Sequence, residues 1–426
     1  MTKDIYITDL AKPVLNAEQQ TMLEYCETLE VNFDCRRLLD EASEAVGLDD
    51  FGPEDFLTRL NLLLDEWGGD PGLTGLGRLT ARSKLLQYAR SRLLIQDLLN
   101  RRPEIHREVI EAPIIVAGLP RSGTTHLLNL LAADLRLRPL PLWESYEPVP
   151  MPGEPATADS SDPRYQRCAK SWAAMQKTSP FVAAMHPMDP DHIHEELELM
   201  GPDFASYNFE WLGYLPRWRD HYYATDQTPH YEYMKTVLKI LQWQDRQRAG
   251  PDYRPKRWVL KCPQHLEQLP VLKAVFPDAV APITFRDPVS VIQSTLYIIA
   301  YGQRISRQSV LMDELAVYWT DRVEHLLHGC ARDRHIWGLE QSIDVPFHQF
   351  MADDFAMAER IYQIADLPMT STARKQIQGY IASHPRGKVG RVIYDLKGAF
   401  GLDPESLRER FQFYFDNFPV KAESSG

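Results

Sequence analysis

The fold of this chain is decided by the stretch Ile114-Ile115-Val116-Ala117-Gly118-Leu119-Pro120-Arg121-Ser122-Gly123-Thr124-Thr125-His126-Leu127-Leu128. Its first residues are a short apolar run, which is typical of a buried parallel strand. Its last residues open a helix with leucines on one side. The turn at Gly123 lets the backbone approach a ligand. Strand, loop and helix in this order present backbone N–H groups and a positive helix end to an anion, so we predict a phosphate-binding loop.

The loop differs from the one that binds nucleoside triphosphates. That loop has the pattern G-x-x-x-x-G-K-[ST]. Here Arg121 follows Pro120, and no lysine follows Gly123. We therefore expect Arg121 and the N–H groups from Ser122 to Thr125 to hold a phosphate without the usual ATP lysine.

A second apolar strand begins at Ala279 and ends in a charged turn at Arg286. Asp287 and Pro288 fit a helix start, with aspartate as the N-cap and proline at the first helical position. Ser294 lies two turns into this helix, on the face that Arg286 can approach. Arginine offers a planar fork for phosphate and serine adds a neutral donor. A surface ion pair of Arg286 with a nearby acid is the alternative.

A third strand is predicted in the segment Arg257–Leu266. Alternation puts Val259 and Lys261 on one face and Trp258 and Leu260 on the other. A lysine at the end of a buried strand is costly without an anionic partner. Lys261 either meets an anion there or reaches solvent along its flexible stem.

A basic loop at His384–Arg391 is the fourth segment. Two glycines allow the backbone to wrap an anion, and Arg386 and Lys388 supply positive charge. A solvated basic loop is the alternative.

In order and spacing, the four segments resemble the sulfotransferases that use 3′-phosphoadenosine 5′-phosphosulfate (PAPS), and most of all the bacterial members with an arginine in the first loop. The resemblance runs from about Leu79 to about Asp403. It implies that Pro120-Arg121-Ser122-Gly123-Thr124-Thr125 binds the 5′-phosphosulfate. It also implies that Arg286 and Ser294, eight positions later, bind the 3′-phosphate.

The resemblance assigns roles to the other two segments. Lys261, with Arg121, would neutralise charge at the transferring group. Arg386, Gly387 and Lys388 would belong to a loop that closes over the 3′-phosphate and adenine. The family often has histidine where this chain has Val389. PAPS is then the co-substrate, and no metal is required.

The general base is predicted by the same resemblance. Several bacterial members place a catalytic glutamate a little over twenty residues after the loop arginine, and Glu144 stands 23 residues after Arg121. Beside Trp143, in a closed site, such a carboxylate would have a raised pKa, which suits a base. Glu147 is the fallback in the same segment.

Histidines offer a competing base. Cytosolic sulfotransferases use one, so His194 or His186 could serve here. The run from His186 to Glu196 also contains possible metal ligands, but it is broken by prolines and lacks a helical i, i+4 ligand pair. We expect no metal site.

Composition fits a globular enzyme. The 426 residues are 44% hydrophobic and 25% charged, enough for a large core and an accessory region. The five cysteines have no C-x-x-C spacing, so we predict neither a disulfide framework nor a zinc site. The net charge of −12 argues against nucleic acid as a partner. No apolar signal region and no run near the ~18 residues of a membrane span are found, so the expected location is the cytoplasm.

The predicted fold is α/β: a P-loop-like three-layer sandwich with a central parallel sheet, preceded by a helical N-terminal region. We divide the chain into helices at 1–105, a PAPS-binding domain at 106–403 with an acceptor-binding insertion at about 145–250, and a C-terminal helix and tail at 404–426. The predicted helices and one further strand are Ala17–Leu29, Cys35–Ala45, Pro53–Trp67, Ala81–Asn100, about Asp354–Ala365 and the strand Ser342–Phe347. The tail from Ala422 is expected to be disordered.

The acceptor region is suggested by dense aromatic residues between Phe204 and Tyr233. They could line a pocket for an apolar or aromatic hydroxyl compound, although core packing accounts for at least half of them. A phenol, a lipid or polyketide hydroxyl, or a sugar remains open, as does a homodimer. Two other functions stay open: an ATP-dependent kinase-like phosphotransferase, disfavoured by the missing G-K-[ST], and a non-catalytic nucleotide-binding scaffold.

Overall fold

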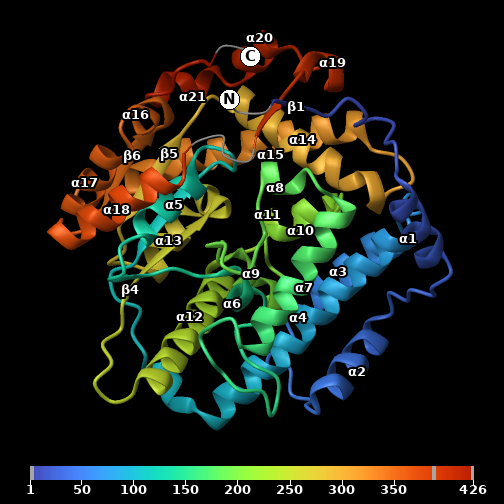
Figure 1. The fold of residues 1–426 in the computed structure, drawn as a ribbon, viewed down its shortest axis with the longest axis horizontal. Helices are drawn as coiled ribbons and strands as arrows, with labels where there is room; N and C mark the ends of the chain where they lie inside the picture. The colour runs from blue at the N-terminus through green and yellow to red at the C-terminus, as the bar shows by residue number, and fades with distance from the viewer. Residues whose placement is uncertain (1–3, 386–389, 424–426) are drawn as a thin grey trace.

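A computed structural model describes residues 4–385 and 390–423. Its centre is a five-stranded parallel sheet in the order β3-β4-β2-β5-β6, with helices packed on both faces (Figure 1). The predicted α/β architecture with a central parallel sheet is therefore confirmed. The strands are β2 (Ile114–Gly118), β3 (Leu137–Arg138), β4 (Arg257–Cys262), β5 (Ala281–Phe285) and β6 (Ser342–Pro346).

The two faces of the sheet belong to two separate hydrophobic clusters. Ile115 and Leu260 pack into the larger one, which also takes in the N-terminal helices. Val116 and Val259 pack into the smaller one, beneath α5 (Thr124–Ala132), α17 (Asp354–Ile364) and α18 (Ser371–Ser383). Side chains alternate along each strand, so a strand buried on both faces reads as a continuous apolar run.

Parallel pairing determines where the functional residues gather. β2 lies between β4 and β5, with Ala117 opposite Cys262 on one side and Ile283 on the other. The carboxyl ends of these three strands therefore meet at one edge of the sheet. Ligands of open α/β sheets bind at this edge.

The N-terminal helices are α1 (Ala17–Glu27), α2 (Cys35–Val46), α3 (Phe56–Gly68) and α4 (Gly75–Arg101). α4 begins six residues before the predicted start at Ala81, because the Thr74 hydroxyl accepts a hydrogen bond from the Gly77 N–H and caps the helix. A two-stranded sheet that the sequence did not indicate joins β1 (Asp4–Tyr6) to β7 (Arg391–Ile393). In Figure 1, helices α1–α3 (blue) lie on the opposite side of the molecule from α17 and α18.

The middle of the chain is helical and packs beside α4. Its helices are α6 (Leu142–Tyr146), α7 (Pro163–Thr178), α8 (Val182–Met185), α9 (Leu197–Met200), α10 (Asn208–Leu212), α11 (Pro216–Ala224) and α12 (Thr228–Ala249). Short 3-10 helices cover Pro103–Arg107, Gly201–Asp203, Pro263–Glu267 and Arg334–Ile336.

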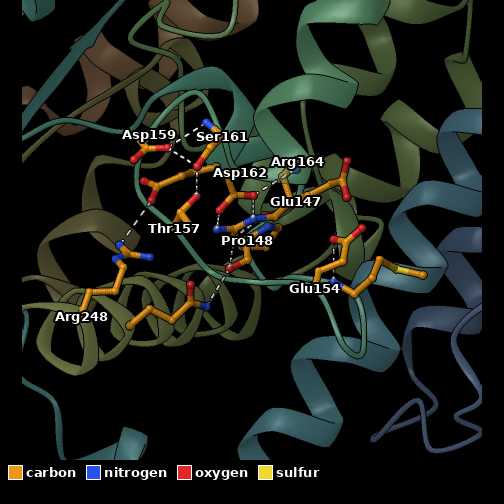
Figure 2. A network of polar contacts seen from close by, with 12 residues as sticks. Glu147, Pro148, Glu154, Thr157, Asp159, Ser161, Asp162, Arg164 and Arg248 are labelled. Atoms are coloured by element: carbon orange, nitrogen blue, oxygen red, sulfur yellow. Dashed lines mark hydrogen bonds and ion pairs between the residues drawn. The ribbon is translucent and has the colours of Figure 1, made fainter.

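A buried ion pair fastens the proline-rich loop between α6 and α7. The Arg164 guanidinium group donates two hydrogen bonds to Asp162, of 2.9 and 2.8 Å, and one of 3.1 Å to the carbonyl of Glu147 (Figure 2). Gln244 of α12 donates to the carbonyl of Pro148 at 2.9 Å. The loop is thereby tied to the helices around it.

The C-terminal part completes the layers with α13 (Leu269–Val275), α14 (Pro288–Ser306), α15 (Met312–Asp333), α16 (Phe347–Ala352), α19 (Leu396–Phe400), α20 (Pro404–Arg410) and α21 (Gln412–Asn417). The Asp287 side chain caps α14 and Pro288 occupies its first position, as predicted. Across the described residues, none of the helices combines the length and the apolar character needed to cross a membrane.

Candidate functional site

The loop between β2 and α5 has the backbone of an anion-binding turn. Arg121 and Gly123 both adopt left-handed conformations, with φ of 64° and 85°. A Cβ atom at position 123 would also lie 3.2 Å from the Phe347 ring, so glycine is required there. Gly123 is the N-cap residue of α5, and no side chain caps this helix. The first amides of α5 are thus left to bind an anion.

Ser122 shapes this loop through its hydroxyl. The Ser122 Oγ lies 2.6 Å from the carbonyl oxygen of Leu119, to which it donates, and 2.6 Å from Thr284 Oγ1. The neighbouring Gly118 must lack a side chain, because a Cβ there would lie 1.8 Å from the same Thr284 oxygen. Both polar groups of Ser122 are therefore used within the loop, because its backbone N–H also donates to the Leu119 carbonyl, at 3.3 Å.

Lys261 at the end of β4 does have the anionic partner that its burial demands. Its Nζ forms an ion pair with Glu195 and lies 3.3 Å from Thr125 Oγ1, in the first turn of α5. Both side chains are buried. Burial raises the pKa of Glu195, and the nearby Lys261 opposes that rise. A carboxylate and an ammonium group thus lie together beside the predicted phosphate loop.

Glu196, the next residue, fixes this arrangement. One carboxylate oxygen accepts a hydrogen bond of 2.8 Å from the backbone N–H of Lys261, and the other lies 2.6 Å from His265 Nε2. His265 Nδ1 in turn lies 2.8 Å from the hydroxyl of Tyr231. The buried chain holds the segment with Glu195 against the end of β4.

Three histidines form a cluster next to this pair. The ring centroids of His186, His192 and His194 are 5.2, 5.7 and 6.3 Å apart. Burial, with nearby positive charge, lowers the pKa of His192 to about 4 and the pKa values of His186 and His194 well below 6.5. In the described ranges, no three or more His, Cys, Asp or Glu side chains are arranged to hold a metal ion.

Arg121 connects the loop to the residues predicted to bind the 3′-phosphate. Its Nε donates to Ser294 Oγ at 2.9 Å, and its carbonyl accepts from Arg286 Nη1 at 2.6 Å. Ser294 therefore faces Arg121, and its Oγ also lies 3.0 Å from the hydroxyl of Tyr394. The guanidinium group of Arg286 donates two hydrogen bonds to the carboxylate of Glu423, from Nε at 2.7 Å and from Nη2 at 2.8 Å. The tail is thus placed at Glu423, where the sequence predicted disorder.

Glu144 is not brought into this site. It lies in α6, buried, with its carboxylate 2.6 Å from Arg138 and 3.7 Å from Arg248. Arg138 also pairs with Asp245 at 3.1 Å. Glu144 is also absent from the residues that line the cavity beside Lys261. Glu147, the fallback, pairs with Arg167 at 2.6 Å.

The predicted basic loop is only partly visible. His384 ends α18, and Arg391 begins β7. Arg386, Gly387, Lys388 and Val389 lie outside the described residues.

A cavity of about 450 Å³ opens onto the Lys261–Glu195 pair. Its polar end includes Arg121, Thr124, Thr125, His186 and His194. Of the aromatic residues between Phe204 and Tyr233, Trp211 and Tyr214 line this cavity, whereas Tyr207, Phe209, Trp218, Tyr222 and Tyr231 are buried in the core. Core packing thus accounts for more than half of that set.

Glu195 is the residue that sequence reasoning did not single out. Three glutamates, at 195, 196 and 198, lie with Leu197 and Leu199 in a stretch that is buried throughout. Acids in such a stretch need cationic partners. That signal, set beside the unexplained Lys261, could have pointed to this pair.

Comparisons with known proteins agree with this geometry. The model of the sulfotransferase family matches residues 113–371. The solved structure of sulfotransferase STF1 from Mycobacterium tuberculosis H37Rv is 28% identical, with a TM-score of 0.75, over 89% of this chain and 98% of that one. Sulfotransferase STF9 from Mycobacterium avium is 25% identical, with a TM-score of 0.81, over 93% and 99%. A search of curated proteins finds no match. With the family model matched across β2 to α17 and beyond, this chain belongs to the sulfotransferase family.

Proposed function

We propose that this enzyme moves a sulfuryl group from PAPS to a hydroxyl of a small-molecule acceptor. The observation that carries the proposal is the buried Lys261–Glu195 pair. It lies beside Thr125 in the first, uncapped turn of α5 and at the end of a cavity large enough for an acceptor. Lys261 would supply a cation for the transferring group, and Glu195 would supply a base for the acceptor. Both lie between the predicted phosphate-binding loop and the cavity for the acceptor.

The donor would be held at two points. The N–H groups from Gly123 to Thr125 suit the 5′-phosphosulfate, because no side chain caps the helix, whereas the N–H of Ser122 donates to the Leu119 carbonyl. Arg286 and Ser294 would take the 3′-phosphate, both of them bonded to Arg121 between the two points. Arg386, Gly387 and Lys388 remain predicted contacts of the same phosphate.

The chemistry is an in-line displacement at sulfur. The acceptor oxygen forms a bond to sulfur while the bond from sulfur to the phosphate oxygen breaks. The hydroxyl proton passes to Glu195, and the departing 5′-phosphate takes the electron pair. Lys261, Arg121 and the loop amides stabilise its growing negative charge. The products are a sulfate ester and adenosine 3′,5′-bisphosphate.

Glu195 replaces Glu144 as the proposed base for two reasons. It lines the cavity beside Lys261, where Glu144 is absent from the lining, and burial raises its pKa. His194 and His186 also line the cavity and are the alternative bases.

Calorimetric titration with adenosine 3′,5′-bisphosphate, ADP and ATP, with and without magnesium, tests the proposal. Selective, magnesium-independent binding of the bisphosphate is expected, because Arg286 and Ser294 suit a 3′-phosphate. A preference for ATP that needs magnesium would instead establish the kinase-like alternative. Selective binding without transfer to any acceptor would favour the non-catalytic scaffold.

A further inference from the structure

We infer that the acceptor is an uncharged and mainly apolar alcohol, such as a long-chain or alicyclic one, and is not a sugar, a charged metabolite or a peptide. The inference rests on the proposed function for the position of the reacting hydroxyl, at Lys261 and Glu195. The rest of the acceptor is described by the walls of the cavity.

The far walls of the cavity are apolar and come from distant parts of the chain. Trp67 of α3, Leu76 of α4 and Trp211 of α10 line the cavity. Ile299 of α14 and Trp319 of α15 complete it. The N-terminal helices thus supply part of the acceptor wall. An acceptor body that displaces water from these side chains gains about 25 cal/mol for each Å² of apolar surface buried.

Charged side chains on the far walls are already neutralised inside the protein. Glu198 pairs with Lys84 at 2.8 Å and also accepts from the Tyr88 hydroxyl at 2.7 Å. Glu210 pairs with Arg322 at 2.8 Å. A charged group on the acceptor would therefore find no free counter-ion among these residues, and burying it would cost free energy.

Arg307, the remaining charge on the far walls, pairs with Asp70 through two nitrogen atoms. Other polar side chains of the lining are bonded within the protein: Asn208 donates to Glu198, Gln303 accepts from the Leu311 N–H, and Ser306 donates to the Gly302 carbonyl. A sugar, with a hydroxyl on nearly every carbon, needs many more partners than this wall offers.

Binding can be measured without sulfate transfer, because three tryptophans line the cavity. The probes are decan-1-ol, 10-hydroxydecanoate and glucose, added to the full chain saturated with adenosine 3′,5′-bisphosphate while tryptophan fluorescence is followed. We expect decan-1-ol to bind at least tenfold more tightly than the other two. Equal or tighter binding of 10-hydroxydecanoate or glucose would overturn the inference.

A filled cavity gives the second test. Leu76→Trp would place a large ring in the cavity from a half-buried position on α4, and Leu79→Trp, half-buried on the same helix but outside the cavity, is the matched control. The KM for decan-1-ol should rise at least tenfold in Leu76→Trp alone, with bisphosphate affinity unchanged in both variants. An unchanged KM in Leu76→Trp would refute this assignment of the acceptor. If the unmodified protein does not bind adenosine 3′,5′-bisphosphate, that result would instead count against the proposed function.

Discussion

Arg286 and Glu423 form a two-point ion pair, with Arg286 Nε 2.7 Å from one carboxylate oxygen and Nη2 2.8 Å from the other. The Glu423 backbone is held as well, because its N–H donates to Asp287 at 2.8 Å and its carbonyl accepts from Arg408 at 2.6 Å. A guanidinium fork that fits a carboxylate also fits a phosphate. The tail thus occupies the group that we propose for the 3′-phosphate, and the two anions must compete.

Glu423→Gln should strengthen bisphosphate binding about two- to fivefold, the size of effect expected for a partly exposed ion pair. The substitution removes the competing charge and leaves the backbone contacts of the tail in place. Titration calorimetry checks it, with Glu409→Gln, an exposed acid of α20, as the control. Equal affinities for the three proteins would show that the tail does not compete.

Arg286→Ala should weaken bisphosphate binding by about 1.5–3 kcal/mol, the contribution of a hydrogen bond to a charged group. The same calorimetry measures the change. In the double variant with Glu423→Gln, removal of the tail charge should no longer raise the affinity for the bisphosphate. The guanidinium group for which the two anions compete is absent from that protein. A gain that persists in the Arg286→Ala background would place the effect of Glu423 elsewhere.

Glu195→Gln should lower kcat about 10²- to 10⁴-fold while bisphosphate affinity stays within twofold, because a base acts only in the transfer step. Glu144→Gln is the informative comparison. It should retain kcat but lower the free energy of unfolding by about 1–3 kcal/mol, since it weakens a buried contact with Arg138. The reverse pattern, with turnover lost in Glu144→Gln alone, would return the base to α6.

Local signals in the sequence predicted most of the fold and picked out the residues that we propose for the donor. The strand–loop–helix at Gly123, the cap at Asp287 and the buried Lys261 each depend on residues close together in the chain. Because β2, β4 and β5 are parallel neighbours, their carboxyl ends bring these residues to one edge of the sheet. What could not be predicted depends on long-range contacts. Spacing along the chain favoured Glu144, but the short helix α6 directs its carboxylate to Arg138.

Two ion pairs show the same limit of prediction from the sequence. Glu195 meets Lys261 from 66 residues away, and Glu423 meets Arg286 from 137 residues away. The sequence can show that a buried acid such as Glu195 needs a cationic partner, but tertiary packing decides which cation it meets. The same holds for β1, which pairs with β7 across nearly the whole chain.

The dependence of kcat on pH should distinguish Glu195 from the histidines. Burial raises the pKa of Glu195 above its ordinary 4.5, and burial lowers the pKa of His194 well below 6.5. A base must be deprotonated to accept a proton, so kcat should fall as the pH drops through the raised pKa of Glu195. The acidic limb of the pH profile of kcat should therefore lie above pH 4.5 in the unmodified enzyme. His194→Asn should keep this limb, because the proton is taken by Glu195 and not by His194, whereas Glu195→Gln should abolish it along with most of the rate. A limb that survives in Glu195→Gln and disappears in His194→Asn would make the histidine the base.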